Sequence, residues 1–174
     1  GVELFQRRQT GVIAFLADAV AQIHDLANDH GCLMHGASVK FQYHDPRLRG
    51  FLVHDEGRIG DDAVHAFLLH TRKAAKRLVS DVLAEARQTG ADLILCTGGM
   101  SVDPDDNTPG GIRQSGARIV TYGAPVLPGA MFLLGYFEDD TPIMGLPGCV
   151  MYAGATIFDL ALPRIAAGVE MTRT

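Results

Sequence analysis

The chain has 174 residues, of which 47% are hydrophobic and 20% are charged, and its formal net charge at pH 7 is −5. This composition is enough for one folded domain and argues against intrinsic disorder. The acidic balance also argues against nucleic acid or an anionic membrane as a partner. We therefore expect a single domain over residues 1–174, in which any small anionic ligand is attracted locally.

Cysteine spacing and hydropathy indicate the cellular compartment in which the protein is expected. The three cysteines are far apart and form no CxxC pair, so neither a disulfide framework nor a sulfur-rich zinc site is indicated. No apolar stretch approaches the roughly 20 residues that a membrane span needs, and the N-terminus lacks a secretion pattern. We expect a cytoplasmic location. Because the chain begins with Gly1, a processed chain or a piece of a longer one is also expected.

The first part of the chain predicts one helix and one or two short strands. Apolar residues at spacings of three and four predict the helix over residues 11–28. The strands are expected within residues 32–41 and at 50–53, around an irregular connection.

A long helix is predicted next, from Asp61 and Asp62 to about Gln88. Acidic groups favour the positive end of the helix dipole, and Gly90 is typical of a helix end. Residues 91–96 then predict a strand buried on both faces, because they are apolar without alternation after the second residue.

A glycine-rich turn with carboxylates follows that strand. It begins with residues 97–101, Thr-Gly-Gly-Met-Ser, and continues through Asp103, Asp105 and Asp106 to Thr108. Adjacent glycines permit positive φ and let a ligand approach the backbone N–H groups, and the carboxylates can hold Mg²⁺. The alternative is a polar turn in which Asp or Asn caps the next helix.

The remaining elements alternate, and a second glycine loop lies among them. They are a short helix from about residue 109, a strand over 117–121, a hairpin of strands at 131–137 and 142–146, and a final helix over 150–167.

Gly145-Leu146-Pro147-Gly148 repeats the pattern of a strand leading into glycine. The element order predicts a three-layer α/β/α sandwich with a mostly parallel sheet and an antiparallel hairpin near the C-terminus. Such sheets bind ligands beyond the carboxyl ends of their strands, so both glycine loops are expected to face one crevice.

Two other kinds of site, a zinc site and a serine hydrolase site, have less support in the sequence. All seven histidines fall in the first 70 positions, but no HxH, HxxxH or HExxH spacing occurs, so we expect ordinary histidines rather than a zinc site. Ser101 lacks an evident His and Asp partner in a nucleophile-elbow pattern, so a serine hydrolase fits poorly. Its hydroxyl is instead expected to form a hydrogen bond to a ligand or to cap the loop.

Residues 97–109, together with 145–148, resemble the molybdopterin-binding domain of molybdenum cofactor biosynthesis proteins. The resemblance is continuous over residues 91–167. Upstream, Gly1-Val2-Glu3-Leu4-Phe5 resembles the opening of the family, whereas residues 24–60 are atypical of it. Gly110 stands where members often carry Glu.

The resemblance implies an α/β/α fold that binds molybdopterin as ligand or substrate. Family members transfer adenylate from MgATP to molybdopterin or insert molybdate into the adenylylated product, and are commonly dimers or trimers. By this resemblance Asp106 is the first candidate for catalysis, assisted by Asp61 and Asp62, and Asp103 and Asp106 are the candidates for Mg²⁺. The residues expected to contact the ligand are Thr97, Gly98, Gly99, Ser101, Thr108, Pro147 and Gly148.

The sequence leaves two alternative functions open. One is a non-catalytic molybdopterin sensor or carrier that keeps both glycine loops. The other is a nucleotide pyrophosphatase of the competence-damage-inducible type, which shares the fold and a G-G…D-D-x-T loop.

Overall fold

The structure is a computed structural model that describes residues 38–41, 48–54, 65–71 and 74–173. These residues contain a seven-stranded sheet in the order β1-β2-β3-β4-β7-β6-β5. Its strands are β1 (Ser38–Phe41), β2 (Leu48–His54), β3 (His65–Thr71), β4 (Leu93–Thr97), β5 (Arg118–Tyr122), β6 (Leu133–Tyr136) and β7 (Pro142–Leu146). One or two short strands were expected within 32–41 and at 50–53, and the structure has two there, β1 and β2. The helix expected over 11–28 lies outside the described residues.

The centre of the sheet is parallel. β3 pairs with β4, and β4 with β7, in parallel, whereas the other neighbouring strands pair antiparallel. It follows that β1, β3, β4, β5 and β7 run in one direction and β2 and β6 in the other. The prediction of a mostly parallel sheet with an antiparallel hairpin near the C-terminus, here β6 and β7, is confirmed.

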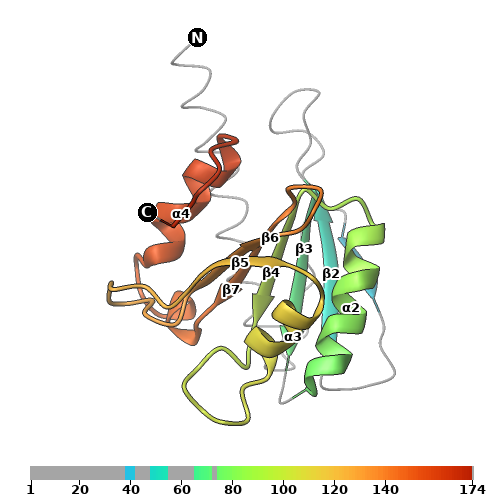
Figure 1. The fold of residues 1–174 in the computed structure, drawn as a ribbon, viewed down its shortest axis with the longest axis horizontal. Helices are drawn as coiled ribbons and strands as arrows, with labels where there is room; N and C mark the ends of the chain where they lie inside the picture. Colours follow the sequence, from blue (N-terminus) through green and yellow to red (C-terminus); the bar gives the residue numbers. More distant parts are fainter. Residues whose placement is uncertain (1–37, 42–47, 55–64, 72–73, 174) are drawn as a thin grey trace.

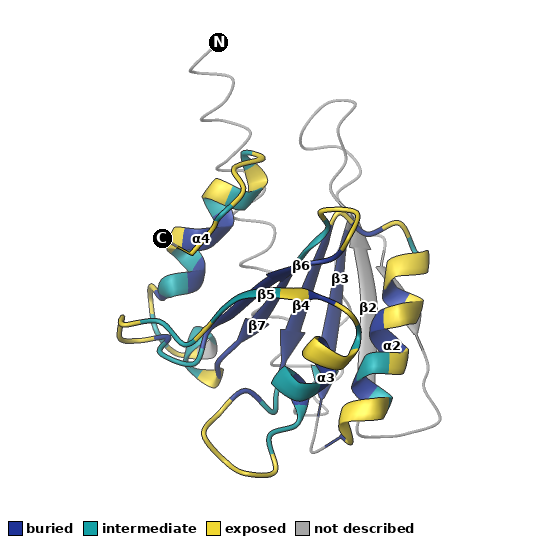
Figure 2. Ribbon diagram, viewed as in Figure 1, coloured by how far each residue is buried: buried dark blue, intermediate teal, exposed yellow. Residues whose placement is uncertain are grey.

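Helices cover both faces of the sheet (Figure 1). α2 (Lys76–Gln88) and α3 (Thr108–Gln114) pack on one face, where Val79, Leu83 and Ile112 contact the core. α4 (Ile157–Ala166) packs on the other face through Phe158 and Leu162. This is the predicted three-layer α/β/α sandwich. Figure 2 shows the central strands β3, β4, β6 and β7 as mostly buried and the outer helix surfaces as exposed.

β4 shows why helices must pack on both faces of the sheet. All five of its residues are buried, and their side chains alternate between the two layers. Leu93 and Leu95 join the cluster on the α4 face, whereas Ile94 and Cys96 join the cluster on the α2 face. The continuous apolar run read in the sequence is therefore a strand buried on both sides.

Residues 65–71 form strand β3, so the prediction of one helix from Asp61 to Gln88 is wrong over this stretch. A short apolar run fits a buried strand as well as a helix, and pairing with β4 decides for the strand. The helix begins only at Lys76. Asp61 and Asp62 lie outside the described residues, and they precede β3 in the sequence rather than α2.

The C-terminal helix is shorter than predicted. A 3₁₀ turn, η1 (Gly148–Met151), follows β7 directly, and α4 starts afresh at Ile157. Its start is fixed by a capping box: the Phe158 N–H donates to the Thr156 hydroxyl, and the Thr156 N–H donates to the Asp159 carboxylate at 2.6 Å. Leu160 of this helix is 53% exposed. In the described part of the chain, no helix has the length and apolar character to cross a membrane.

Candidate functional site

Three strands end together at one edge of the sheet. His70 near the end of β3 pairs with Thr97 at the end of β4, and Thr97 pairs with Leu146 at the end of β7. The next residues along the chain are Gly98 after β4 and Pro147 after β7. The two glycine loops therefore leave from neighbouring strands at the same edge, which is the arrangement that the sequence predicted.

The first loop requires glycine at two positions. Gly98 and Gly99 have φ values of 76° and 57°, which disfavour residues with a side chain. A Cβ on Gly98 would lie 2.0 Å from the Thr71 carbonyl oxygen, and one on Gly99 would lie 2.7 Å from the Thr108 hydroxyl. The protein itself therefore accounts for both glycines through conformation and close packing.

Two buried hydroxyls hold the first loop on β3. The hydroxyls of Thr71 and Thr108 both donate to the carbonyl oxygen of Gly98, at 3.0 and 2.9 Å, and lie 2.7 Å from each other. Both threonines are almost fully buried. Thr108, expected to contact a ligand, thus braces the loop. Thr71 was not singled out in the sequence, and its only signal is its place at the end of a buried strand.

Asp106 closes the first loop on itself. Its carboxylate accepts a hydrogen bond from the backbone N–H of Ser101 at 2.6 Å, and its own N–H donates to the Asp103 carbonyl oxygen. Asp106 is half-buried, whereas Ser101 and Asp103 are exposed. One carboxylate oxygen of Asp106 is thus fixed by the loop, much of which is exposed between β4 and α3 (Figure 2).

Thr97 is turned into the protein. It is 3% exposed, and its hydroxyl lies 2.9 Å from Nδ1 of His70 on the neighbouring strand. Residues at paired positions of adjacent strands point to the same face, so this contact follows from the register. His70 is half-buried.

The second loop is less constrained. Pro147 is buried, but Gly148 is exposed, its φ is not positive, and a Cβ there would have no atom within 4 Å. η1 has no side-chain cap at its start. Cys149 in this turn is half-exposed, whereas Cys96 is fully buried and burial raises the pKa of its thiol. Cys96 is therefore not a candidate nucleophile.

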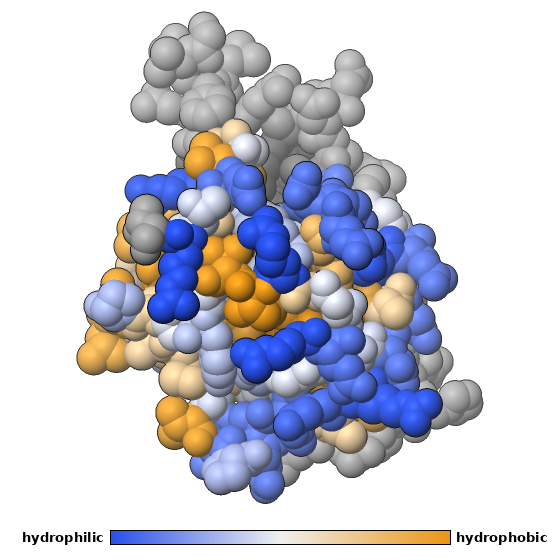
Figure 3. Space-filling model, viewed as in Figure 1, coloured by the Kyte–Doolittle hydropathy of each residue, from blue (hydrophilic) through white to orange (hydrophobic). Residues whose placement is uncertain are grey.

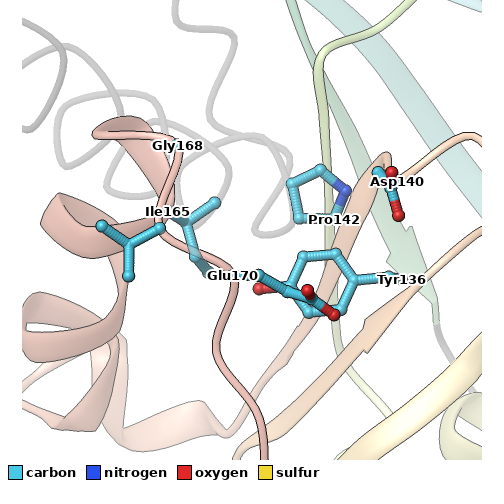
Figure 4. A pocket seen from close by; sticks show the side chains of 7 residues that line it. Tyr136, Asp140, Pro142, Ile165, Gly168 and Glu170 are labelled. Atoms are coloured by element: carbon cyan, nitrogen blue, oxygen red, sulfur yellow. The ribbon is translucent and has the colours of Figure 1, made fainter.

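Among the described residues, two cavities lie away from the glycine loops. One of about 270 Å³ is lined by Tyr136 at the end of β6, by Pro142 at the start of β7, and by Asp140 and Glu170 (Figure 4). Because β7 begins there, this cavity is at the opposite edge of the sheet from Gly148. The other, of about 240 Å³, lies between β5 and α4. Neither is lined by a glycine-loop residue, so the candidate site rests on the shared edge and its chemistry.

The surface and charges at that edge suit a polar ligand. Figure 3 shows the face of the molecule that carries α2 and α3, where mostly hydrophilic residues surround a hydrophobic middle. Within the described residues, no three His, Cys, Asp or Glu side chains are grouped as a metal site. A cation at Asp103 and Asp106 would therefore need oxygen atoms from a ligand to complete its shell, which is how Mg²⁺ commonly binds phosphates.

These features define an α/β/α domain with two glycine loops at the carboxyl edge of its parallel strands. The family model of the "Probable molybdopterin binding domain" matches residues 49–167. The chain belongs to this family. Of residues 24–60, which are atypical of the family, the match includes only 49–60, and it does not include Gly1–Phe5.

Among solved structures, the molybdopterin biosynthesis enzyme MoaB from Thermus thermophilus is similar at 26% sequence identity. The similarity covers 53% of this chain and 60% of that chain, with a TM-score of 0.35. The chain thus spans less than two thirds of that protein. No curated protein matches the chain.

Proposed function

We propose that this domain binds molybdopterin or its adenylylated form and acts in molybdenum cofactor biosynthesis. The observation that carries the proposal is the pairing of Thr97 with Leu146, which starts both glycine loops from one sheet edge in a chain of the molybdopterin-binding family. Ligands of open α/β sheets bind beyond this edge.

The chemistry of the two loops suits the terminal phosphate of molybdopterin. Backbone N–H groups are fixed donors that do not titrate, and glycine lets an anion approach them closely. Gly98 and Gly99 supply such a stretch beside β4, and Gly148 supplies the exposed one beside β7. Ser101 adds a hydroxyl at the exposed end of the first loop.

Asp106 is the residue to which we assign Mg²⁺ or ligand positioning, with Asp103 beside it. Ser101 fixes the position of the Asp106 carboxylate through one oxygen. A bound Mg²⁺ would neutralise phosphate charge during adenylyl transfer from ATP or molybdate insertion. For either reaction the chain's own residues orient the anions. We extend the proposal to a homodimer or homotrimer, as the resemblance implies.

A second candidate, molybdopterin binding without catalysis, is favoured by the start of α2. A carboxylate pair is expected from the sequence at the start of this helix. The helix instead begins at Lys76, its N-cap is Ala75, and no acidic residue lies in its first turn. The chain from Thr71 to Lys76 contains no carboxylate either. Two of the three residues expected for catalysis, Asp61 and Asp62, therefore do not stand at the start of α2, the place assigned to them.

Incubation with MgATP and molybdopterin separates these candidates. Release of pyrophosphate supports adenylyl transfer, and tight pterin binding without turnover supports a sensor or carrier. Molybdate insertion is tested with adenylylated molybdopterin and molybdate. Hydrolysis of ADP-ribose without pterin binding would instead indicate the nucleotide pyrophosphatase.

Asp106→Asn tests the proposed role directly. We expect turnover, or molybdopterin affinity if the chain only binds, to fall about 100-fold, because a charged group that orients or neutralises phosphate is lost. The free energy of unfolding should change by less than about 1 kcal/mol, since the Asn oxygen can still accept from Ser101. Asp140→Asn removes the same charge at the opposite edge and serves as the control. Equal activity of both variants would contradict the assignment.

A further inference from the structure

Tyr122 is an exposed aromatic residue at the edge that carries the glycine loops. It ends β5, which runs in the same direction as β4 and β7, and it is 41% exposed. By contrast, Tyr136 is 5% exposed, and its hydroxyl accepts a hydrogen bond from the Met171 N–H at 3.1 Å. The fold thus uses Tyr136 in its interior and leaves the ring of Tyr122 partly open to solvent.

The register places Tyr122 in one row with Cys96 of β4, two residues before Gly98. Tyr122 pairs with Leu133, Leu133 with Gly145, and Gly145 with Cys96. Directly paired residues point to the same face. Leu133 and Cys96 belong to the cluster on the α2 face, so Tyr122 points to that face too. Two strand spacings, about 10 Å, separate Tyr122 from Gly145.

A β-bulge is responsible for this direction. Ile119 pairs with Gly135, but Thr121 pairs with Leu134, so the register shifts between them. Val120 and Thr121 consequently both lie on the α4 face, where they line the cavity beside Leu134. Regular alternation would have sent Tyr122 to that face as well. The bulge redirects it to the face that carries the glycine loop, a recognised use of bulges near functional sites.

The first glycine loop folds over the same row. Met100 is buried and packs on Gly145, where a Cβ would lie 2.5 Å from its terminal carbon. Beyond it, the carboxylate of Asp106 lies close enough to Tyr122 to contribute, after burial, to raising the pKa of its hydroxyl. The ring of Tyr122 and the carboxylate assigned to the ligand therefore lie on the same side of the sheet.

We propose that the ring of Tyr122 forms the aromatic wall against which the pterin of molybdopterin stacks while the glycine loops hold its phosphate. This inference rests on the proposed function. A fused heterocycle presents a flat π-face, and stacking on an exposed aromatic ring removes apolar surface of both from water. The chain has no tryptophan, and Tyr122 is an aromatic ring that the bulge turns to this face.

The test measures dissociation constants of molybdopterin under anaerobic conditions for the full chain and for three variants. Tyr122→Leu keeps apolar bulk but removes the π-face, and should weaken binding about 5- to 150-fold. Tyr122→Phe keeps the ring and should bind within about twofold of the unchanged chain. Leu127→Ala, a change at an 85% exposed apolar residue five positions later, should have no effect.

Pyrophosphate is the second probe, because it lacks a ring. Its affinity should be the same for the unchanged chain and Tyr122→Leu. Three results would overturn the stacking role and leave the proposed function standing. The unchanged chain and Tyr122→Leu could bind molybdopterin equally well, or Tyr122→Leu could lose as much affinity for pyrophosphate as for molybdopterin. Tyr122→Phe could also lose as much molybdopterin affinity as Tyr122→Leu. If the unchanged chain does not bind molybdopterin, both proposals fall. Circular dichroism and thermal unfolding confirm that each variant is folded, and Tyr122→Phe still tests the stacking role if Tyr122→Leu does not fold.

Discussion

The two glycine loops start from neighbouring strands but are built differently. In the first, Gly98 and Gly99 have positive φ, are crowded by Thr71 and Thr108, and are tied down by two buried hydroxyls. In the second, Gly148 has ordinary φ, open space around it and no side-chain cap. The folded protein alone accounts for the glycines of the first loop, whereas no contact among the described residues requires glycine at position 148. The proposed phosphate contact would supply a reason for glycine there.

The largest effect on stability is expected for Gly98→Ala. Positive φ disfavours alanine, and the new Cβ would overlap the Thr71 carbonyl oxygen, so we expect a loss of about 3 kcal/mol in the free energy of unfolding. Gly90→Ala is the matched control, since Gly90 has φ of 73° with no atom within 4 Å of a Cβ, and should cost about 1 kcal/mol. Urea unfolding measures both. Equal losses would show that close packing does not constrain the first loop.

The buried hydroxyl pair should give the next largest effect. Thr71→Val and Thr108→Val each remove one donor to the Gly98 carbonyl and should each cost about 1–2 kcal/mol. The double variant leaves that carbonyl without a hydroxyl donor, so its loss should exceed the sum of the single losses by at least about 0.5 kcal/mol.

Urea unfolding of the four chains gives the coupling free energy, and Thr121→Val is the control. The Thr121 hydroxyl also donates to a backbone carbonyl, but at a half-exposed position, so its loss should stay below about 0.5 kcal/mol. Additive losses at Thr71 and Thr108 would mean that the two hydroxyls do not brace the loop together.

Sequence patterns predicted the region from residue 91 onward because its signals are local. The unbroken apolar run before Gly98, the glycine pair and Pro109 specify a strand, a turn and a helix without reference to the rest of the chain. β4 and α3 are confirmed within two residues of the predicted starts. The shared edge also followed, because short connections between alternating strands and helices favour a parallel sheet.

The stretch before α2 was mispredicted because its signal is not local. Phe67, Leu68 and Leu69 fit a helix stripe as well as a strand, and the pairing of β3 between β2 and β4 decides between them. That error moved the expected start of the helix from Lys76 to Asp61. Thr71 and Tyr122 were missed for a related reason, since one acts through a contact 37 residues away and the other through a bulge.

Gly148→Ala should have the smallest effect on stability and the clearest effect on binding. The site has room for a methyl group and no positive φ, so the free energy of unfolding should change by less than about 0.5 kcal/mol. If a phosphate approaches the backbone of Gly148, the methyl group obstructs it and molybdopterin affinity should fall about tenfold. Gly154→Ala, also exposed and unobstructed, is the matched control for the added methyl group. Unchanged affinity in Gly148→Ala would remove the second loop from the site and leave the first loop alone to hold the phosphate.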